Sequence, residues 1–309
     1  MKPAVSVVTA TRNYARFLAG AIRSVQAQTF TDWELVLIDD GSTDATPDVV
    51  RPFLVDPRVR YVRSDALGQT RAKNLSVVLA RAPLLAFFDS DDVWLPRKLE
   101  KQYALFQSNP ALAVVACRRS LIDEDGAPLP SRQPVLPRGA AFAQFVLENP
   151  VCFSSVMLRR EVLEHVGRFD LRLELAIDYD LWLRISRHYA FDYVDEVLVQ
   201  YRTGHANLSR RQRDRIRSVL SIIRCCLGRR GGQAQVSQGE LSEAWGSTYR
   251  SMAYALRESA PGTALGWYAR AAGRDGRLAA SARSILATLA RWFWQTGRRI
   301  AGRAPAVRR

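Results

Sequence analysis

The first 115 residues alternate between short apolar runs rich in β-branched residues and longer segments with apolar residues at helical spacing. This alternation is typical of repeated βαβ units around a parallel sheet. The nearly continuous apolar run at 34–38 suits a strand that is buried on both faces. We therefore expect an α/β fold, with strands at 5–8, 34–38, 60–62, 84–88 and 113–117 and helices at 15–28, 71–81 and 96–107.

The pattern changes further along the chain. Residues 118–150 are richer in Pro and Gly and predict few regular elements. Periodicity then returns in three segments, which predict helices at 161–166 and 179–187 and a strand at 194–201. Beyond about residue 211 the chain becomes rich in Arg and Ala at helical spacing. We therefore expect a mostly parallel α/β domain over 1–210 and a basic helical region over 211–309.

The net positive charge of the chain comes from its C-terminal part. The formal net charge is +15, but the last 109 residues contain 21 Arg and 5 acidic residues, whereas the first 200 residues are nearly neutral. Within this part, residues 278–300 combine Arg with Leu, Trp and Phe in an amphipathic pattern. Such a helix can bind an anionic membrane surface, or it can pack against the body of the protein or another protomer. Nucleic acid is not an expected partner.

Cysteine usage and hydropathy indicate a cytoplasmic protein. The four cysteines form no CxxC pair and have no His at zinc-finger spacing, so neither a metal knuckle nor a disulfide framework is predicted. The sequence contains no run of about eighteen uncharged apolar residues, the length that a membrane-spanning helix needs. We expect a cytoplasmic location, with peripheral binding at the inner face of the cell membrane as a role for the basic region.

Two apolar strands end abruptly in carboxylates. Residues 39–42 read Asp-Asp-Gly-Ser after Ile38, and residues 89–92 read Asp-Ser-Asp-Asp after Phe88. Ligands of open α/β sheets bind beyond the C-terminal strand ends, so both clusters should line one cleft. Asp89 and Asp91 are suited to holding Mg²⁺ or Mn²⁺ together with phosphate oxygens. Alternatively, Asp-Asp-Gly-Ser only begins a loop and Asp92 only caps a helix.

Several motifs in order resemble the family 2 glycosyltransferases of GT-A fold. They are the segments 5–13 (VSVVTATRN), 27–29 (AQT), 33–44 (WELVLIDDGSTD), 72–74 (AKN) and 88–94 (FDSDDVW). The resemblance extends from about residue 4 to residue 210. It implies a GT-A sandwich and an inverting transfer of a sugar from a nucleoside-diphosphate sugar, with a UDP-sugar as the expected donor, to an acceptor hydroxyl. The implied acceptor is a saccharide or a lipid-linked molecule, in the synthesis of a cell-surface polysaccharide or glycolipid.

The resemblance also implies roles for individual residues. Thr11 and Asp39 would contact the nucleotide base region, Asp89 the ribose, and Asp91 a divalent metal that bridges the diphosphate. The Ala-Arg-Asn motif of the family is Ala72-Lys73-Asn74 here, so Lys73, or the adjacent Arg71, would provide the cation for phosphate. The aromatic residue that follows the first strand in the family is Arg12 here.

The second half of the domain should provide the catalytic base. Residues 176–184 resemble the family segment in which a Glu-Asp pair opens a helix and the Asp deprotonates the acceptor. Ile177 occupies the Glu position and Asp178 the Asp position. His205 stands one residue later than the His of the family's Tyr-Arg-x-His pattern, which contributes to the metal site. Asp178 as a helix cap and His205 as a solvated loop residue are the structural alternatives.

Two other functions remain open from the sequence. A nucleotidyltransferase also uses paired Asp residues and metal at a parallel sheet edge, but it would usually carry a Gly-rich, Lys-containing phosphate loop, which is absent here. A protein that binds nucleic acid or an anionic surface would use the Arg-rich C-terminal region.

Overall fold

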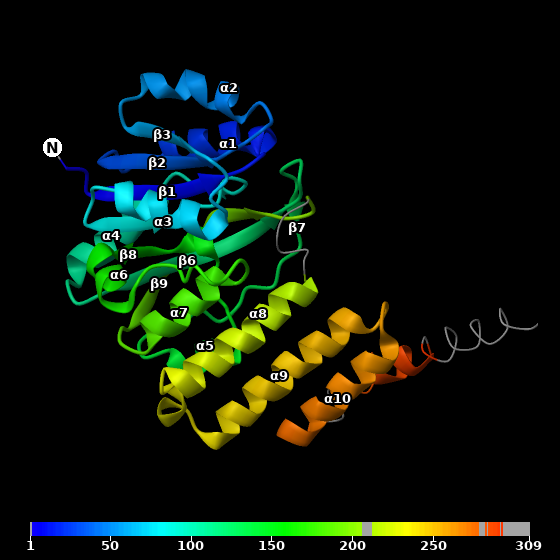
Figure 1. Ribbon diagram of the computed structural model, residues 1–309. Helices are drawn as coiled ribbons and strands as arrows, with labels where there is room; N and C mark the ends of the chain where they lie inside the picture. Colours follow the sequence, from blue (N-terminus) through cyan, green and yellow to red (C-terminus); the bar gives the residue numbers. More distant parts are fainter. Residues whose placement is uncertain (1, 206–211, 278–281, 283, 291, 293–309) are drawn as a thin grey trace, which may run out of the picture. The chain divides into compact units, whose positions relative to one another are not determined.

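The structure is a computed structural model of the 309-residue chain and describes residues 2–205, 212–277, 282, 284–290 and 292. The chain forms two compact units (Figure 1). The first consists of Met1–Phe145 and Asn149–Asn207, and the second of Val146–Glu148 and Leu208–Arg309.

The first unit is built on one mixed sheet, which has nine strands in the described residues. They are β1 (Val5–Thr11), β2 (Trp33–Asp40), β3 (Val59–Ser64), β4 (Leu84–Phe87), β5 (Val93–Trp94), β6 (Val114–Ile122), β7 (Pro128–Leu129), β8 (Met157–Arg159) and β9 (Phe191–Arg202).

The order of the strands places the parallel βαβ half of the unit on one side of the sheet. The order is β3-β2-β1-β4-β8-β6-β9-β5, with β7 paired to β6. Strands β3, β2, β1 and β4 are parallel to their neighbours. The short strand β8 is antiparallel to β4 and to β6, and β6 is parallel to β9. The C-terminal ends of β1, β2 and β4 therefore lie at the same edge.

Helices outside the C-terminal region connect and cover these strands. They are α1 (Ala15–Gln26), α2 (Thr46–Val50), α3 (Gln69–Leu79), α4 (Lys98–Ser108), α5 (Phe142–Leu147), α6 (Arg160–Val166) and α7 (Ile177–Ser186), with the 3₁₀ turns η1 (Arg51–Val55) and η2 (Phe153–Ser155). Helix α3 packs on β1 and β2, as Figure 1 shows.

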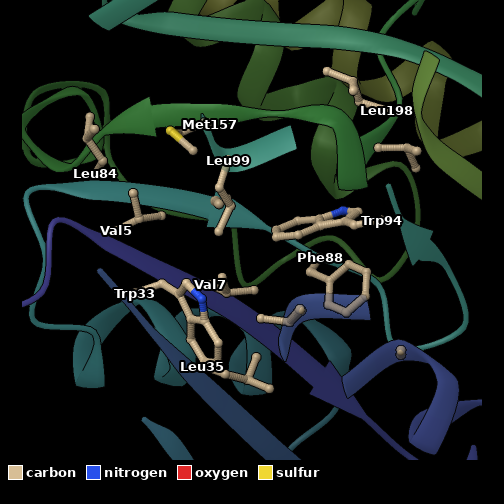
Figure 2. Packing of buried hydrophobic residues seen from close by; sticks show 14 of the residues in the cluster. Val5, Val7, Trp33, Leu35, Leu84, Phe88, Trp94, Leu99, Met157 and Leu198 are labelled. Atoms are coloured by element: carbon tan, nitrogen blue, oxygen red, sulfur yellow. The ribbon is translucent and has the colours of Figure 1, made fainter. Parts of the chain in front are cut away.

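One hydrophobic cluster of the first unit lies against one face of the sheet. Leu18, Ile22 and Val25 of α1 recur at helical spacing and pack with Val5 and Val7 of β1, which alternate with residues facing the other side. Figure 2 shows Phe88 and Trp94 in the same cluster as Leu99 of α4. Because these side chains are buried together, β1 and β4 are held in place. The polar residues that follow each strand therefore lie at a defined position at its end.

The second unit contains three long helices in its described residues. They are α8 (Gln212–Arg224), α9 (Gln238–Leu256) and α10 (Pro261–Asp275), with the short turns η4 (Cys225–Arg229) and η5 (Gly232–Gln235). Ser237 and Glu240 form a capping box that begins α9. The core of this unit includes Ile216 and Leu220 of α8 and Met252 and Leu256 of α9.

Most of the basic amphipathic segment at 278–300 lies outside the described residues, which include only 282, 284–290 and 292 of it. Its binding to a membrane or to protein therefore stays a prediction. Among the helices that the structure describes, none has the length and apolar character needed to cross a membrane.

The predicted fold class is confirmed: the chain has an α/β sheet with parallel βαβ connections, followed by helices. The main differences are at element boundaries. The helix predicted from residue 96 begins at Lys98, because Pro96 and Arg97 form a turn in which the backbone N–H of Lys98 donates to the carbonyl oxygen of Leu95. The helix predicted from residue 71 begins at Gln69, after Gly68, whose φ of 89° is a backbone conformation that favours glycine.

Candidate active site

The two carboxylate clusters predicted at strand ends lie at the same edge of the sheet. Thr11 at the end of β1 is paired in register with Asp39 of β2. The Ser90 hydroxyl, in the turn after β4, donates to Oγ1 of Thr11 across 3.1 Å. The parallel pairing of β1 with both β2 and β4 produces this meeting, because it aligns the three C-terminal ends.

Asp39 is buried, and both of its carboxylate oxygens accept hydrogen bonds. The backbone N–H of Ser42 donates to Oδ1 at 2.9 Å, and the Tyr61 hydroxyl donates to Oδ2 at 2.5 Å. Arg63 lies 3.6 Å from the same Oδ2. Burial of Tyr61 and its hydrogen bond to Asp39 raise the pKa of Tyr61 to about 12. Tyr61 and Arg63 of β3 are thus neighbours of Asp39 that sequence reasoning missed, since no local motif marks them.

Asp40, in contrast, supports the loop that leads to α3. Its carboxylate accepts the backbone N–H groups of Leu67 and Gly68 at 2.5 and 2.9 Å. Gly41 follows with a φ of 68°, and a Cβ at this position would lie 2.8 Å from the backbone nitrogen of Ala66. Within the Asp-Asp-Gly-Ser segment, Asp40 and Gly41 therefore build the loop, and Asp39 lies at the end of β2.

Lys73 and Asp89 form an ion pair at this edge. Lys73 Nζ donates to Oδ1 of Asp89 at 2.7 Å and lies 3.5 Å from the centre of the Phe153 ring. Burial raises the pKa of Asp89, and the negative charges of Asp91 and Asp178 act in the same direction, whereas the Lys73 ammonium lowers it. Arg71, the other cation considered for phosphate, is exposed on α3.

Asp91 and His205 come together from distant parts of the chain. The Oδ2 atom of Asp91 lies 2.8 Å from Nε2 of His205, and both side chains are largely buried. The rings of Phe17 and Tyr14 lie 4.8 and 5.7 Å from the imidazole, between centroids. Burial raises the pKa of Tyr14, and the charge of Asp91 adds to this effect. Nδ1 of His205 is buried and has no hydrogen-bond partner among the described residues.

Asp92 is a structural anchor of the turn after β4. Its carboxylate accepts the Ser154 hydroxyl and the backbone N–H of Arg202. Burial raises the pKa of Asp92 well above its usual range. The helix-cap alternative for Asp92 is not what the structure shows, because the residue that precedes α4 is Arg97.

Arg202 fixes the same turn from the end of β9. Its Nε donates to the carbonyl oxygen of Asp91 at 2.8 Å, and its Nη1 donates to the carbonyl oxygens of Asp123 and Glu124 at 3.0 Å each. Because His205 follows three residues later, this anchoring also determines where the imidazole lies. Arg202 stands at the Arg of the Tyr-Arg-x-His pattern, but no local signal in the sequence predicts these contacts.

Asp178 lies in the first turn of α7. The helix is preceded by Ala176, whose φ is 56°, and no side chain caps it, so Asp178 does not act as its N-cap. The side-chain amide of Asn149 donates to Oδ2 of Asp178 at 3.2 Å. The charge of Asp178 contributes to the raised pKa of Asp89, so the two carboxylates lie within electrostatic reach. Asp180 instead pairs with Arg184, 2.9 Å away.

The comparison with protein families identifies the chain. Residues 6–167 match the model described as Glycosyl transferase family 2, which is more than half of the chain. The chain belongs to glycosyl transferase family 2. It is an enzyme, a glycosyltransferase, and the resemblance seen in its motifs is confirmed. The matched region includes the edge formed by Thr11, Asp39 and Asp89 but ends before Asp178 and His205.

Two relatives of this family 2 glycosyltransferase extend the similarity beyond the matched region. An uncharacterised glycosyltransferase of Methanocaldococcus jannaschii is 28% identical over 229 residues, which are 72% of this chain and 79% of the relative. TuaG of Bacillus subtilis, a glycosyltransferase named for teichuronic acid biosynthesis, is 29% identical over 211 residues, which are 67% of this chain and 82% of TuaG.

Solved structures show the same fold as this family 2 glycosyltransferase. TarS 1–349 of S. aureus in complex with UDP-GlcNAc has a TM-score of 0.60 at 15% identity and covers 92% of both chains. The mannosyltransferase PcManGT of Pyrobaculum calidifontis, in complex with GDP-Man and Mn²⁺, has a TM-score of 0.55 at 17% identity and covers 96% of this chain and 88% of PcManGT. The fold is therefore the GT-A type.

Proposed function

We propose that this enzyme transfers a sugar from a nucleoside-diphosphate sugar to an acceptor hydroxyl with inversion at the anomeric carbon. The observation that carries the proposal is the gathering of Lys73, Asp89 and the Asp91–His205 pair at one strand edge, with Asp178 within electrostatic reach. The relatives support a nucleotide-sugar donor, since TarS has been solved with UDP-GlcNAc and PcManGT with GDP-Man.

The donor would lie along the ends of β1, β2 and β4. Thr11 and Asp39 would contact the base region and Asp89 the ribose, in keeping with their common edge. Lys73 is the better placed of the two candidate cations, because its ammonium already lies at Asp89 whereas Arg71 is exposed. A diphosphate would give this ammonium a second anionic partner, and it would stabilise the charge that develops as the nucleotide leaves.

The Asp91–His205 pair fits a divalent metal. It offers one carboxylate oxygen, which suits Mn²⁺ or Mg²⁺, and one imidazole nitrogen, which favours a transition ion such as Mn²⁺ over Mg²⁺. The Nδ1 atom of His205 is buried without a partner in the described part of the chain. Within those same residues, no group of three or more His, Cys, Asp or Glu side chains could hold a metal ion. Phosphate oxygens of the donor would therefore complete the coordination, and the bound metal would neutralise charge on the diphosphate.

Asp178 would act as the general base. As the acceptor oxygen attacks the anomeric carbon, Asp178 would take its proton, and the bond to the diphosphate would break on the opposite face of the sugar. One displacement of this kind inverts the configuration. Asp180 is unsuited to the role because its carboxylate is already engaged by Arg184 within the buried part of α7.

The acceptor class follows from the relatives rather than from the site. TuaG is named for teichuronic acid biosynthesis, and an Escherichia coli relative, 26% identical over 198 residues, is named chondroitin synthase. A saccharide or a lipid-linked saccharide acceptor, in the synthesis of a cell-surface polysaccharide or glycolipid, accords with these names. A cytoplasmic enzyme that reaches a lipid-linked acceptor through its basic C-terminal segment would serve such a reaction.

A panel of nucleotide-sugars tests the proposal. Thermal unfolding is measured with UDP-, GDP-, CDP- and dTDP-sugars, with and without Mn²⁺, and free sugars serve as controls. A ligand that binds only the folded state, at about 100 times its Kd, stabilises the protein by about 2.7 kcal/mol. We expect a UDP-sugar to raise the Tm, and to do so more strongly with Mn²⁺. If no nucleotide-sugar raises the Tm, the proposal is wrong.

A further inference from the structure

The general base lacks the acidic neighbour that its family segment would provide. Ile177 stands at the position of the Glu, and its side chain is buried, only 2% exposed. No carboxylate therefore stands immediately before Asp178 to orient a substrate or to hold the base. The side chain that contacts Asp178 comes instead from a distant part of the chain, 29 residues earlier.

The Asn149 amide has a defined orientation. Its Oδ1 atom accepts the backbone N–H of Val151 at 3.4 Å, so the NH₂ group is the end that faces Asp178, and Nδ2 donates to Oδ2 at 3.2 Å. Pro150 and Val151, which follow, are buried and anchor the backbone of Asn149. Nearby, the Tyr179 hydroxyl donates to the carbonyl oxygen of Phe145 at 2.7 Å, which holds the first turn of α7.

We propose that Asn149 is a positioning residue for the general base. By holding Oδ2 of Asp178, it leaves Oδ1 free to face the acceptor hydroxyl, and Oδ1 accepts no hydrogen bond within the described residues. This inference rests on the proposed function, because it assumes that Asp178 is the base. Positioning of this kind matters because a displacement of about 1 Å at a reacting group can cost roughly 100-fold in rate.

An uncharged hydrogen-bond donor suits the charges around Asp178. The carboxylate of Asp89 lies within electrostatic reach and is itself paired with Lys73, and on α7 the charge of Asp180 is compensated by Arg184. A carboxylate at position 149 would add a further repulsive charge beside Asp178. An amide fixes the geometry without that repulsion, which distinguishes Asn149 from the Glu that the family segment carries at position 177.

The test compares two substitutions at one position. Asn149→Ala removes the amide. Asn149→Asp keeps the shape of the side chain but replaces the NH₂ hydrogen-bond donor with a carboxylate oxygen. Gln144→Ala is the matched control, because it removes another side-chain amide of the same segment, which donates to the carbonyl oxygen of Val135. The measured quantities are kcat and KM for nucleotide release from UDP-GlcNAc in water, and the increase in Tm produced by UDP with Mn²⁺.

We expect Asn149→Ala to lower kcat by roughly 10- to 100-fold, with the KM for UDP-GlcNAc and the effect of UDP on Tm unchanged. Asn149→Asp should be slower still although it is isosteric, which a packing role would not produce. Gln144→Ala should behave like the wild type. Wild-type kcat in both Asn149 variants, while Asp178→Asn loses turnover, would overturn the positioning role and leave the base assignment standing.

Two further results separate this inference from the proposed function. If Asp178→Asn keeps full turnover, the base assignment is wrong and the positioning role is wrong with it. Crystal structures of the wild type and of Asn149→Ala provide a measurement that needs no substrate. We expect the Asp178 side chain to leave its wild-type rotamer in the variant, and an unchanged rotamer would contradict the inference.

Discussion

The carboxylate of Asp91 lies 2.8 Å from Nε2 of His205, although 114 positions separate the two residues in the chain. Asp91 follows β4 in the middle of the sheet, and His205 follows β9 near its other side. Arg202 connects the two segments, because its guanidinium donates to the carbonyl oxygen of Asp91. This relationship is the basis of the proposed metal site.

Asp91→Ala should abolish the effect of Mn²⁺ on nucleotide binding. The substitution removes the carboxylate of a two-residue site, so the Tm of the UDP complex should no longer rise when Mn²⁺ is added. His205→Ala should weaken the effect, because one ligand remains. Asp48→Ala serves as the control, since it removes an exposed carboxylate that pairs with Arg51. A variant of Asp91 that keeps the full Mn²⁺ effect would contradict the metal assignment.

Lys73→Ala should weaken donor binding more than Arg71→Ala. Lys73 lies at the site and a charged hydrogen bond contributes about 1.5 to 3 kcal/mol, so we expect the Kd for UDP to rise by roughly 10- to 100-fold. Arg71 is exposed on the same helix, and its removal should change the Kd by less than about twofold. Isothermal titration of both variants with UDP and Mn²⁺ measures the difference. The reverse order of effects would assign the phosphate contact to Arg71.

Asp178→Asn should slow transfer while leaving donor binding intact. General-base catalysis contributes about 100- to 10,000-fold, so kcat should fall within that range while the effect of UDP on Tm is unchanged. Asp180→Asn is the paired comparison on the same helix. Because Arg184 would lose its charged partner, that variant should lose stability instead, with little direct effect on the chemical step. Equal losses of turnover in both variants would argue against a special role for Asp178.

Gly41→Ala should destabilise the protein, whereas Gly20→Ala should not. A Cβ at Gly41 would lie 2.8 Å from the backbone nitrogen of Ala66, and the φ of 68° is unfavourable for alanine. We expect a loss of about 1 to 3 kcal/mol in the free energy of unfolding. Gly20 lies within α1 with no atom within 4 Å of such a Cβ, so alanine there should stabilise by up to about 1 kcal/mol. Urea unfolding measures both changes.

Asp56 should contribute stability that disappears in acid. Hydrogen bonds from Arg58 lower the pKa of Asp56 from 3.8 to about 2. Because the folded-state pKa is the lower one, the contribution is fully present above pH 3.8 and is lost as the pH falls towards 2. Asp56→Asn should therefore lower the free energy of unfolding at pH 7 by about 1 kcal/mol. It should also reduce the dependence of that free energy on pH between 3.8 and 2.

In the control for this prediction, Asp48→Asn removes an exposed carboxylate and should leave the acid part of the stability profile close to that of the wild type. A profile of Asp56→Asn that is identical to the wild type would show that the Arg58 pair contributes nothing.

The sequence by itself determined the α/β fold class and the strand ends at which Thr11, Asp39, Asp89 and Asp91 lie. These features are local, since a buried strand is marked by a continuous apolar run and its end by the first polar residues. The parallel order of the βαβ units then brings those ends to one edge. The same local signals could not predict the short strands β5, β7 and β8, which are held by pairing with distant strands.

Only the tertiary structure decided which residues meet across that edge. Lys73 and Arg71 are two positions apart and point in different directions on α3, so the packing of the helix on β1 and β2 selects Lys73. Tyr61 reaches Asp39 because β3 pairs with β2, and His205 reaches Asp91 because β9 ends beside the turn after β4. Asn149 meets Asp178 through a loop that has no periodicity. Such contacts depend on how distant segments fold back on one another, which no spacing within a single motif encodes.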